Sequence, residues 1–177
     1  MSRIFISGAS AGLGLMAAEL LVQQGHQVVL QARNAARAED ARVALPGAEA
    51  VVEGDLDTIT GTKAVAERVN RLGRFDAVIH NAAVGYRESH HLTKDALPHV
   101  FAINTLSVYI LTALIERQQA HLTQAWLASG EDPKSQVTGK YFHHLKRMEP
   151  NPQAQDPALQ DRLIAICADI SGVTLPT

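Results

Sequence analysis

The chain has 177 residues, of which 46% are hydrophobic, and its formal net charge is -2 at pH 7. This length can bury one sizeable core and is short for two full domains, so we expect a single domain over residues 1–177. The charge, without any long run of lysine or arginine, argues against nucleic acid or an anionic membrane as a partner. Cys167 is the single cysteine, so no internal disulfide can form.

No apolar run reaches the ~18 residues that are needed to span a bilayer. The N-terminal apolar run is broken at Gly8, too early for a signal peptide. We therefore expect a soluble, cytoplasmic protein.

The first predicted elements are a strand, a glycine turn and a helix. The apolar run Ile4 to Ile6 is followed by the glycines Gly8, Gly12 and Gly14. Apolar residues then recur at helical spacing at Leu13, Met16, Ala17, Leu20 and Leu21. A turn without side chains lets backbone N–H groups approach a phosphate, and a helix N-terminus adds its positive dipole end. The pattern indicates the first unit of a dinucleotide-binding fold, with an ordinary strand-to-helix turn as the alternative.

Strands and helices alternate through the following residues. Strands are predicted at 27–30, 48–53 and 75–80. Helices are predicted at 35–43 and from a cap at Asp57 or Thr58 to about residue 72. The alternation predicts an α/β fold with a parallel sheet and right-handed crossovers, in which the strand at 75–80 is buried on both faces.

The second half begins with a helix over residues 94–117, in which Pro98 is tolerable only near the start. This helix is apolar on nearly all sides, so the sheet and a second element must both cover it. A helix at 119–129, a strand at 136–142 and a final helix at 157–170 complete the predicted order.

The turn from Ser7 to Gly14 resembles the TGxxxGxG turn of the short-chain dehydrogenase/reductase family, with Ser7 in place of the leading Thr. The resemblance implies a Rossmann-like three-layer sandwich with a mostly parallel sheet. It also implies a nicotinamide cofactor and hydride transfer to or from a small-molecule carbonyl or alcohol. The cofactor-binding residues that it implies in the turn are Gly8, Ser10, Ala11, Gly12, Leu13 and Gly14.

The residues after the second strand choose the cofactor in such folds. A carboxylate there binds the ribose 2′-OH, whereas an arginine accommodates a 2′-phosphate. Arg33 and Asn34 stand at this place and no acid does, so we expect NADP(H), with the Arg33 guanidinium on the phosphate. A solvated surface arginine is the alternative.

Three further landmarks match the family. Asp55 and Leu56 follow the third strand, where the family's aspartate lies beside the adenine. His80-Asn81-Ala82-Ala83 resembles the family's Asn-Asn-Ala-Gly, so the resemblance implies that Asn81, Ala82 and Ala83 line the cofactor cleft. Ala83 replaces a glycine and would be strained at a positive φ. Asn104 matches the helical asparagine that supports the active-site lysine through a water, with a polar residue at a helix kink as the alternative.

The catalytic pair of the family is absent from this sequence. In Tyr-x-x-x-Lys, one helical turn places the ammonium beside the phenol and lowers the pKa of the phenol. His90, Ala113 and Leu145 instead stand four residues after the tyrosines, which are Tyr86, Tyr109 and Tyr141.

We therefore interpret the chain as a family member with an internal deletion near residues 116–121, which removes the family's catalytic serine together with the Tyr-x-x-x-Lys segment. Residues 1–117 are the nucleotide-binding core, and 118–177 are a remnant of the family's closing helix, strand and helix. About 70 residues are missing relative to a typical member. Without the family's fifth strand, we expect the strand at 136–142 to pair beside 75–80. We also expect the apolar helix to self-associate, giving a homo-oligomer.

Two function classes remain. The first is an NADP(H)-dependent oxidoreductase of the short-chain type, catalytically inactive as the sequence stands. The alternative is a non-catalytic NADP(H)-binding or oligomerising module. No metal site is expected, because the adjacent pairs His90–His91 and His143–His144 would point in different directions on a helix or a strand.

Overall fold

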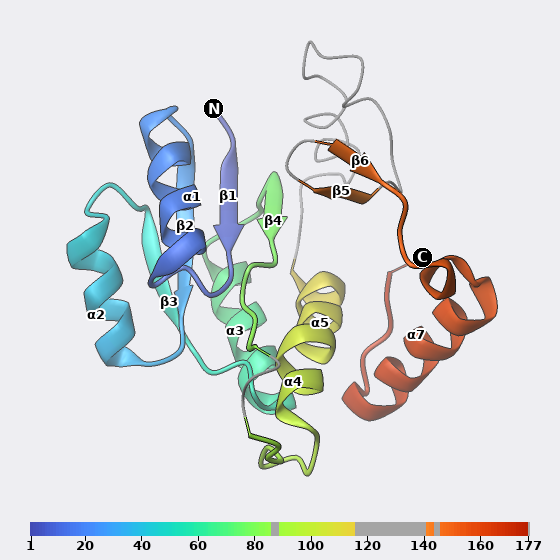
Figure 1. The fold of residues 1–177 in the computed structure, drawn as a ribbon. Coiled ribbons are helices and arrows are strands. Elements are labelled where there is room, and N and C mark those ends of the chain that lie inside the picture. Colours follow the sequence, from blue (N-terminus) through green and yellow to red (C-terminus); the bar gives the residue numbers. More distant parts are fainter. Residues whose placement is uncertain (86–88, 116–140, 144–145, 177) are drawn as a thin grey trace. The chain divides into compact units, whose positions relative to one another are not determined.

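The computed structural model describes residues 1–85, 89–115, 141–143 and 146–176 (Figure 1). The chain divides into two compact units, Met1–Gln118 with Leu175–Thr177, and Gln119–Thr174. In the described residues, no helix has the length and apolar character that crossing a membrane requires.

The first unit is built on a parallel sheet. Its strands are β1 (Arg3–Ile6), β2 (Gln27–Ala32), β3 (Ala50–Glu53) and β4 (Ala77–Ile79), in the order β3-β2-β1-β4. The register places Ile6 between Leu30 of β2 and Ile79 of β4. Since all four strands run the same way, their carboxyl ends meet at one edge of the sheet (Figure 1).

Helices cover both faces of this sheet. The helices are α1 (Gly12–Gln23), α2 (Ala35–Ala44), α3 (Ile59–Arg71), α4 (His99–Phe101) and α5 (Ser107–Leu114), with a π-helical turn at Ala102–Leu106. Helices α1 and α2 pack on one face, and α3 and α5 pack on the other (Figure 1). The predicted Rossmann-like three-layer α/β sandwich is therefore confirmed.

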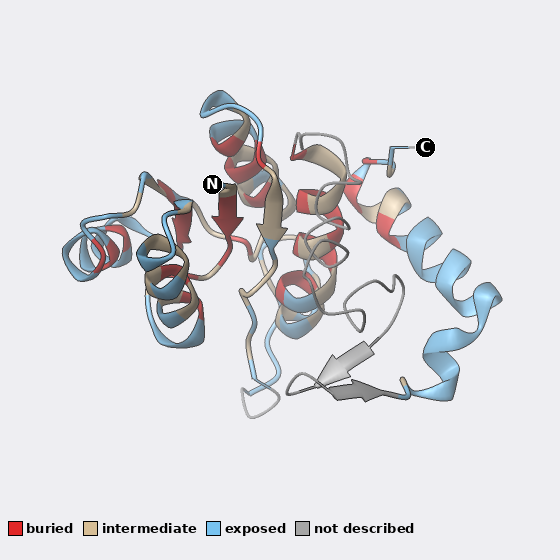
Figure 2. Cartoon of the chain, turned by 90° about the horizontal axis from the view of Figure 1, so that it is seen from above, coloured by how far each residue is buried: buried red, intermediate tan, exposed pale blue. Residues whose placement is uncertain are grey.

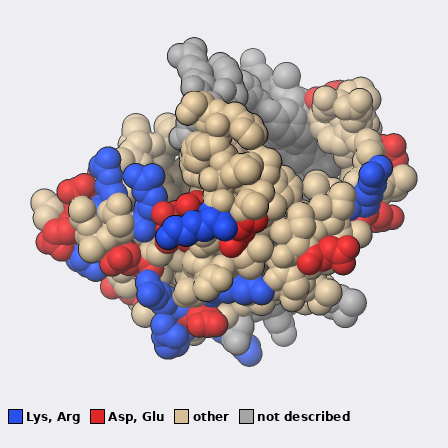
Figure 3. Space-filling view, turned by 90° about the horizontal axis from the view of Figure 1, so that it is seen from below, with Lys and Arg blue, Asp and Glu red and all other residues tan. Residues whose placement is uncertain are grey.

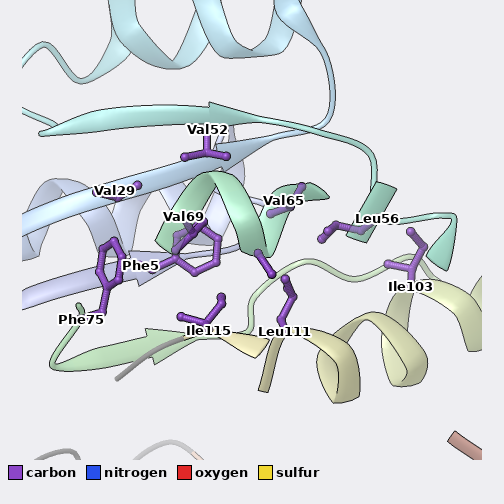
Figure 4. Packing of buried hydrophobic residues seen from close by; sticks show 11 residues of the cluster. Phe5, Val29, Val52, Leu56, Val65, Val69, Phe75, Ile103, Leu111 and Ile115 are labelled. Atoms are coloured by element: carbon purple, nitrogen blue, oxygen red, sulfur yellow. The ribbon is translucent and has the colours of Figure 1, made fainter. Parts of the chain in front are cut away.

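Two hydrophobic clusters hold the layers together, one on each face of the sheet. In the first, Phe5 and Val29 of the strands meet Val65 and Val69 of α3 and Leu111 of α5 (Figure 4). In the second, alternate residues of the same strands pack on Ala18 of α1 and Ala41 of α2. Because successive strand residues point to opposite faces and both faces are covered, the central strands carry continuous apolar runs, Ile4–Ile6 in β1 and Val28–Leu30 in β2. Figure 2 shows buried residues gathered in β1 and on the inward sides of its neighbouring helices.

The helix caps follow the expected chemistry. The Asn34 side chain accepts a hydrogen bond from the Arg37 N–H (3.0 Å), so Asn34 caps α2. Of the two predicted caps of α3, the structure selects Thr58, whose Oγ1 accepts from the Gly61 N–H (3.1 Å). The Asp95 carboxylate adds a bond from the Ile59 N–H (2.6 Å), which ties the loop before α4 to the start of α3.

Two predictions about the edge of the sheet were wrong. Strand β4 is shorter than predicted, and Ile79 is 37% exposed, so the strand is not buried on both faces. The described end of the predicted strand at 136–142 is β5 (Tyr141–His143), which pairs antiparallel with β6 (Lys146–Met148) and not with β4. A partner a few residues along the chain closes a far smaller loop than β4 would, at lower entropic cost. Residues 136–140 lie outside the described residues.

The helix predicted after the glycine turn is confirmed as α1, and the helix predicted at 94–117 needs correction. Of the apolar residues that recur along α1, Leu13, Met16 and Leu20 are 79%, 62% and 54% exposed, whereas Leu21 packs against the second cluster. The buried residues of α1 are Gly14 and Ala18, whose small size lets the helix lie close to the sheet. The predicted helix at 94–117 begins only at His99, because residues 93–98 form a turn that Thr93 closes onto Leu97 (N···O 2.8 Å).

The second unit contains the β5–β6 hairpin, a 3-10 turn at Pro152–Gln155 and α7 (Pro157–Ser171). Asp156 caps α7 through the Ala158 N–H (2.9 Å), and the helix ends at Gly172 with φ 63°. The final helix predicted at 157–170 is confirmed. The helix predicted at 119–129 lies outside the described residues.

Phe75 offers a direct test of the first cluster. Its ring is fully buried, meets the Phe5 ring edge-on at a centroid distance of 6.1 Å, and lies beneath the Arg3 guanidinium at 4.7 Å. Phe75→Ala is expected to lower the free energy of unfolding by about 3–5 kcal/mol in urea denaturation, because it leaves a cavity. Val43→Ala, at a 72% exposed site on α2, is the control and should change stability by less than about 0.5 kcal/mol. Equal losses in the two variants would contradict this packing.

Candidate functional site

A cavity of about 670 Å³ lies where the carboxyl ends of the four strands meet. Each strand is followed by a segment that contributes to its wall. The predicted cofactor residues that line it are Gly8, Ser10, Leu13, Arg33, Asp55, Leu56, Asn81, Ala82 and Ala83. The predicted site residues Ala11, Gly12, Gly14, Asn34 and Asn104 are not among its lining residues. Charged side chains of both signs are interspersed on the side of the molecule toward which the strands run (Figure 3).

The glycines of the turn are required for different reasons. Gly8 has φ +64°, and a Cβ there would lie 2.6 Å from the Ala82 Cα. Gly14 has an ordinary φ, but a Cβ there would collide with the Asn81 side-chain amide. Gly12 has φ +61° and open space around it, so its requirement is conformational only. The turn thus approaches the end of β4 as closely as backbone atoms allow.

Helix α1 begins without a cap. Its N-cap residue, Ala11, has no side-chain acceptor, and its first turn contains no acidic residue. The first N–H groups of a helix have no partner within the helix, and the dipole end there is positive. The start of α1 therefore fits a phosphate group, since no side chain caps its N–H groups.

Ser7 is a site residue that the sequence interpretation missed. Its buried hydroxyl oxygen accepts hydrogen bonds from the N–H groups of Asn81 and Ala82, both at 3.1 Å. The Asn81 side-chain amide donates in return to the carbonyl oxygens of Ser7 (3.1 Å) and Gly8 (2.8 Å). The signal was present in the sequence, because Ser7 keeps the hydroxyl of the threonine that it replaces.

Gln31 is the second missed residue. It is 2% exposed, its side-chain oxygen accepts from the Gly8 N–H (2.7 Å), and its side-chain nitrogen donates to the Gly54 carbonyl (2.6 Å). The only signal was a polar residue inside the apolar strand β2.

Arg33 and Asn34 follow β2, but they have different roles. Arg33 lines the cavity with an exposed side chain, and in the described part of the chain no hydrogen bond or ion pair engages its guanidinium. Asn34 is occupied as the cap of α2.

The end of β4 tolerates both of its departures from the family pattern. Among the described residues other than glycine, Ala96 alone has a positive φ, so Ala83 is not strained. His80, in place of an asparagine, is hydrogen-bonded through Nε2 to the Thr112 hydroxyl of α5 (2.9 Å).

Asn104 lies in the π-helical turn before α5. Its side chain accepts from the Val84 N–H (2.9 Å) and donates to the Val84 carbonyl (3.0 Å). Asn104 therefore holds the segment after β4, which lines the cavity. Such π-helical turns are frequent at functional sites.

A family model of short chain dehydrogenases matches residues 2–123. The chain belongs to the short-chain dehydrogenase family. An uncharacterized oxidoreductase of Emericella nidulans is 55% identical over 124 residues, which are 69% of this chain and 49% of that protein. The short-chain dehydrogenase chry4 of Gibberella zeae is 41% identical over 65% of this chain and 44% of that protein. The chain thus spans about half the length of these curated relatives.

Solved structures show the same fold. The crystal structure of an uncharacterized protein from Mycobacterium Paratuberculosis superposes with a TM-score of 0.77 at 17% identity, covering 100% of this chain and 96% of that one. L-sorbose reductase from Gluconobacter frateurii, in complex with NADPH and L-sorbose, superposes with a TM-score of 0.55 at 25% identity. The latter match covers 71% of this chain and 48% of that one.

A carboxylate pair and a histidine pair complete the wall of the cavity. Burial raises the pKa of the Asp57 carboxyl, and the nearby Asp55 charge raises it further, against the opposing effect of His99. The rings of His91 and His99 lie 4.2 Å apart between centroids. Nowhere in the described residues do three His, Cys, Asp or Glu side chains form a group that could hold a metal ion.

The glycine turn makes a stability prediction. Gly12→Ala and Gly25→Ala each place an alanine at positive φ in open space, which should cost about 1–2 kcal/mol of unfolding free energy. Gly8→Ala should cost more, at least about 3 kcal/mol, because backbone atoms at Ala82 cannot move aside as a flexible side chain can. Urea denaturation measures all three, with Gly25→Ala as the matched control. A Gly8→Ala loss no larger than the control would show that the close approach is wrong.

The raised pKa of Asp57 predicts how the stability of the protein depends on pH. Its pKa is higher in the folded than in the unfolded protein, so the folded state binds more protons between the two values. The contribution of Asp57 to the free energy of unfolding therefore falls as the pH rises from its unfolded-state pKa through its folded-state pKa. Asp57→Asn should raise Tm at pH 8 by at most about 3 °C, since the carboxyl is only partly buried, and the gain should shrink toward about pH 4. A gain that grows as the pH falls would contradict the sign.

Proposed function

We propose that this chain binds NADP(H) in the cavity at the carboxyl edge of its sheet. The observation that carries the proposal is that this one cavity is lined from the ends of all four strands, including the glycine turn, Arg33, Asp55 and Asn81. Ligands of open α/β sheets bind outside the carboxyl ends of the strands. The uncapped start of α1 supports a phosphate there, and Gly8 and Gly14 leave room for the backbone to approach it.

The preference for NADP(H) over NAD(H) rests on Arg33. Its guanidinium lines the cavity after β2, the place where a 2′-phosphate is read in such folds. A planar guanidinium donates paired hydrogen bonds to phosphate oxygens, and no acid stands there to bind a free 2′-OH. The NADPH of the similar L-sorbose reductase supports the same choice.

The reaction class that we propose is hydride transfer to or from a small-molecule carbonyl or alcohol. The bound cofactor supplies the hydride, whereas the chain's own residues bind the nucleotide and orient it. The Asn104 amide, through Val84, holds the segment that follows β4. Since the sequence contains no Tyr-x-x-x-Lys, no residue pair of that kind moves the proton, and the 177 residues are inactive by themselves.

The missing pair also favours a second candidate, a non-catalytic NADP(H)-binding module that assembles with further copies of itself in the cytoplasm. The two candidates bind the same nucleotide. Turnover of a simple ketone with NADPH by these 177 residues, followed by absorbance, would favour the oxidoreductase and contradict the inactivity proposed above. Nucleotide binding without turnover favours the non-catalytic module.

Arg33 gives the proposal its test. In a fluorescence titration, NADPH is expected to bind the wild-type chain more tightly than NADH does. Arg33→Ala should weaken NADPH binding by about 10- to 100-fold, because it removes charge-assisted hydrogen bonds to the 2′-phosphate. NADH, which lacks that phosphate, should change by less than about threefold.

Arg42→Ala is the matched control, since Arg42 is exposed near the end of α2 and does not line the cavity. It should leave both affinities unchanged. If the wild-type chain fails to bind either nucleotide, the proposed function is wrong. If Arg33→Ala weakens NADPH and NADH equally, the cofactor choice is wrong and the nucleotide site stands.

A further inference from the structure

Gln31 is a buried polar residue that lies between the two halves of the nucleotide cavity. On one side is the glycine turn that begins α1, and on the other is the segment that leads from β3 into Asp55. The side chain is 2% exposed, and the strand around it is apolar. A buried amide is retained at little cost only where both of its ends are hydrogen-bonded.

The orientation of this amide is fixed by its neighbours. The Gly8 N–H can only donate, so it faces the Gln31 oxygen at 2.7 Å. The Gly54 carbonyl can only accept, so it faces the Gln31 nitrogen at 2.6 Å. A donor on one side and an acceptor on the other require an amide or a protonated carboxyl, and no apolar or ionised side chain satisfies both.

Gln31 also decides which N–H groups of the turn remain for a ligand. Its backbone carbonyl accepts from the Ala9 N–H at 3.0 Å, while its side chain takes the Gly8 N–H. Two consecutive donors of the turn are therefore committed to one residue of β2. The donors left for a phosphate begin at Ser10, at the start of α1.

We propose that Gln31 is a positioning residue for NADP(H), which sets the spacing between the phosphate-binding turn and the loop that carries Asp55. This inference rests on the proposed function, because it names what the buried amide does for the same cavity. Gly54 directly precedes Asp55, so the Gln31 bridge joins two parts of the wall that would contact different parts of the nucleotide, a phosphate at the turn and the adenine beside Asp55. A small displacement of either part would misplace one part of the ligand relative to the other.

The substitution that tests this is Gln31→Glu, which keeps the shape of the side chain. Its carboxylate accepts from Gly8 but cannot donate to Gly54, whereas its protonated form can do both. Proximity to a carbonyl oxygen and burial both favour the protonated form. We measure the Kd of NADP⁺ by calorimetry from pH 5 to pH 8, because NADP⁺ is stable in acid.

The variant should bind NADP⁺ about tenfold more weakly than wild type at pH 8, and within about threefold of wild type at pH 5. Gln31→Met, whose thioether accepts only weakly from Gly8 and cannot donate to Gly54, should stay weakened at every pH. The other titratable groups of the cavity wall, together with the ligand's own phosphate, are the same in wild type and variant, so the ratio of the two Kd values isolates position 31. Those groups are Arg33, Asp55, Asp57, His91 and His99.

Gln27→Glu is the control, because Gln27 is exposed at the other end of β2. Its Kd ratio to wild type should stay flat with pH. A flat ratio for Gln31→Glu, or wild-type affinity of Gln31→Met, would overturn the inference while leaving the proposed function intact. A residue with a purely structural role would shift Tm without this pH-dependent recovery of affinity.

Wild-type protein supplies a second measurement in case the variants do not fold. Amide hydrogen exchange should be slow at Gly8 and Ala9 without ligand, and NADP⁺ should add protection from Ser10 onward. Fast exchange at Gly8 in the ligand-free chain would contradict the bridge. Failure of wild-type protein to bind NADP⁺ at all would overturn the proposed function and, with it, this inference.

Discussion

The close approach of the β1–α1 turn to the end of β4 is the constraint on which the rest of the nucleotide cavity depends. Gly8 and Gly14 allow the turn to lie against Asn81 and Ala82 without side chains between them. Ser7 and Asn81 then exchange hydrogen bonds across the junction, so the buried polar groups of both segments are satisfied. Because the cavity wall continues from this junction into Val84, the position of α5 is linked to it through Asn104.

The described sheet ends at β4, and apolar side chains on β4 and on α1 remain exposed. In the parallel register Ile79 lies beside Ile6, so it faces the side that α1 covers. Ile79 is nevertheless 37% exposed, and Leu13, Met16 and Leu20 of α1 are exposed as well. Matched relatives of this family are about twice as long as the aligned part of this chain. Apolar side chains are thus left at the surface on β4, the end strand of the described sheet, and on α1, which covers the same face.

The sequence predicted the first half of this fold well because each element there has its own local signal. Glycine spacing, the helix cap at Thr58 and apolar strand runs all depend on residues close in sequence. Which segments pair or pack together depends also on residues that are distant in sequence. The hairpin of β5 with β6, and the exposure of Leu13 on α1, follow from which other segments are present to pair or pack, and periodicity alone holds no such information.

The residues of the candidate site also fall into those that the sequence could predict and those that it could not. Gly8, which needs glycine for its backbone conformation, and Arg33, which we propose reads the cofactor by its charge, were both predictable from their place after a strand. Ser7 and Gln31 act by joining segments that are distant in sequence, and only the three-dimensional arrangement reveals what each one bonds. Their side chains were visible as polar residues beside apolar strands, but their partners were not.

The two missed residues give the glycine turn its rigidity from opposite sides. Ser7, together with Asn81, fixes it to β4, while Gln31 fixes it to β2 and, through Gly54, to the end of β3. A turn rich in glycine would otherwise lose much conformational entropy on binding a ligand. Since the fold has already ordered it, that entropy is lost during folding and not during binding. The donors that the bridges leave unclaimed lie at the positive end of α1, so the same hydrogen bonds that make the turn rigid also direct where an anion can be held.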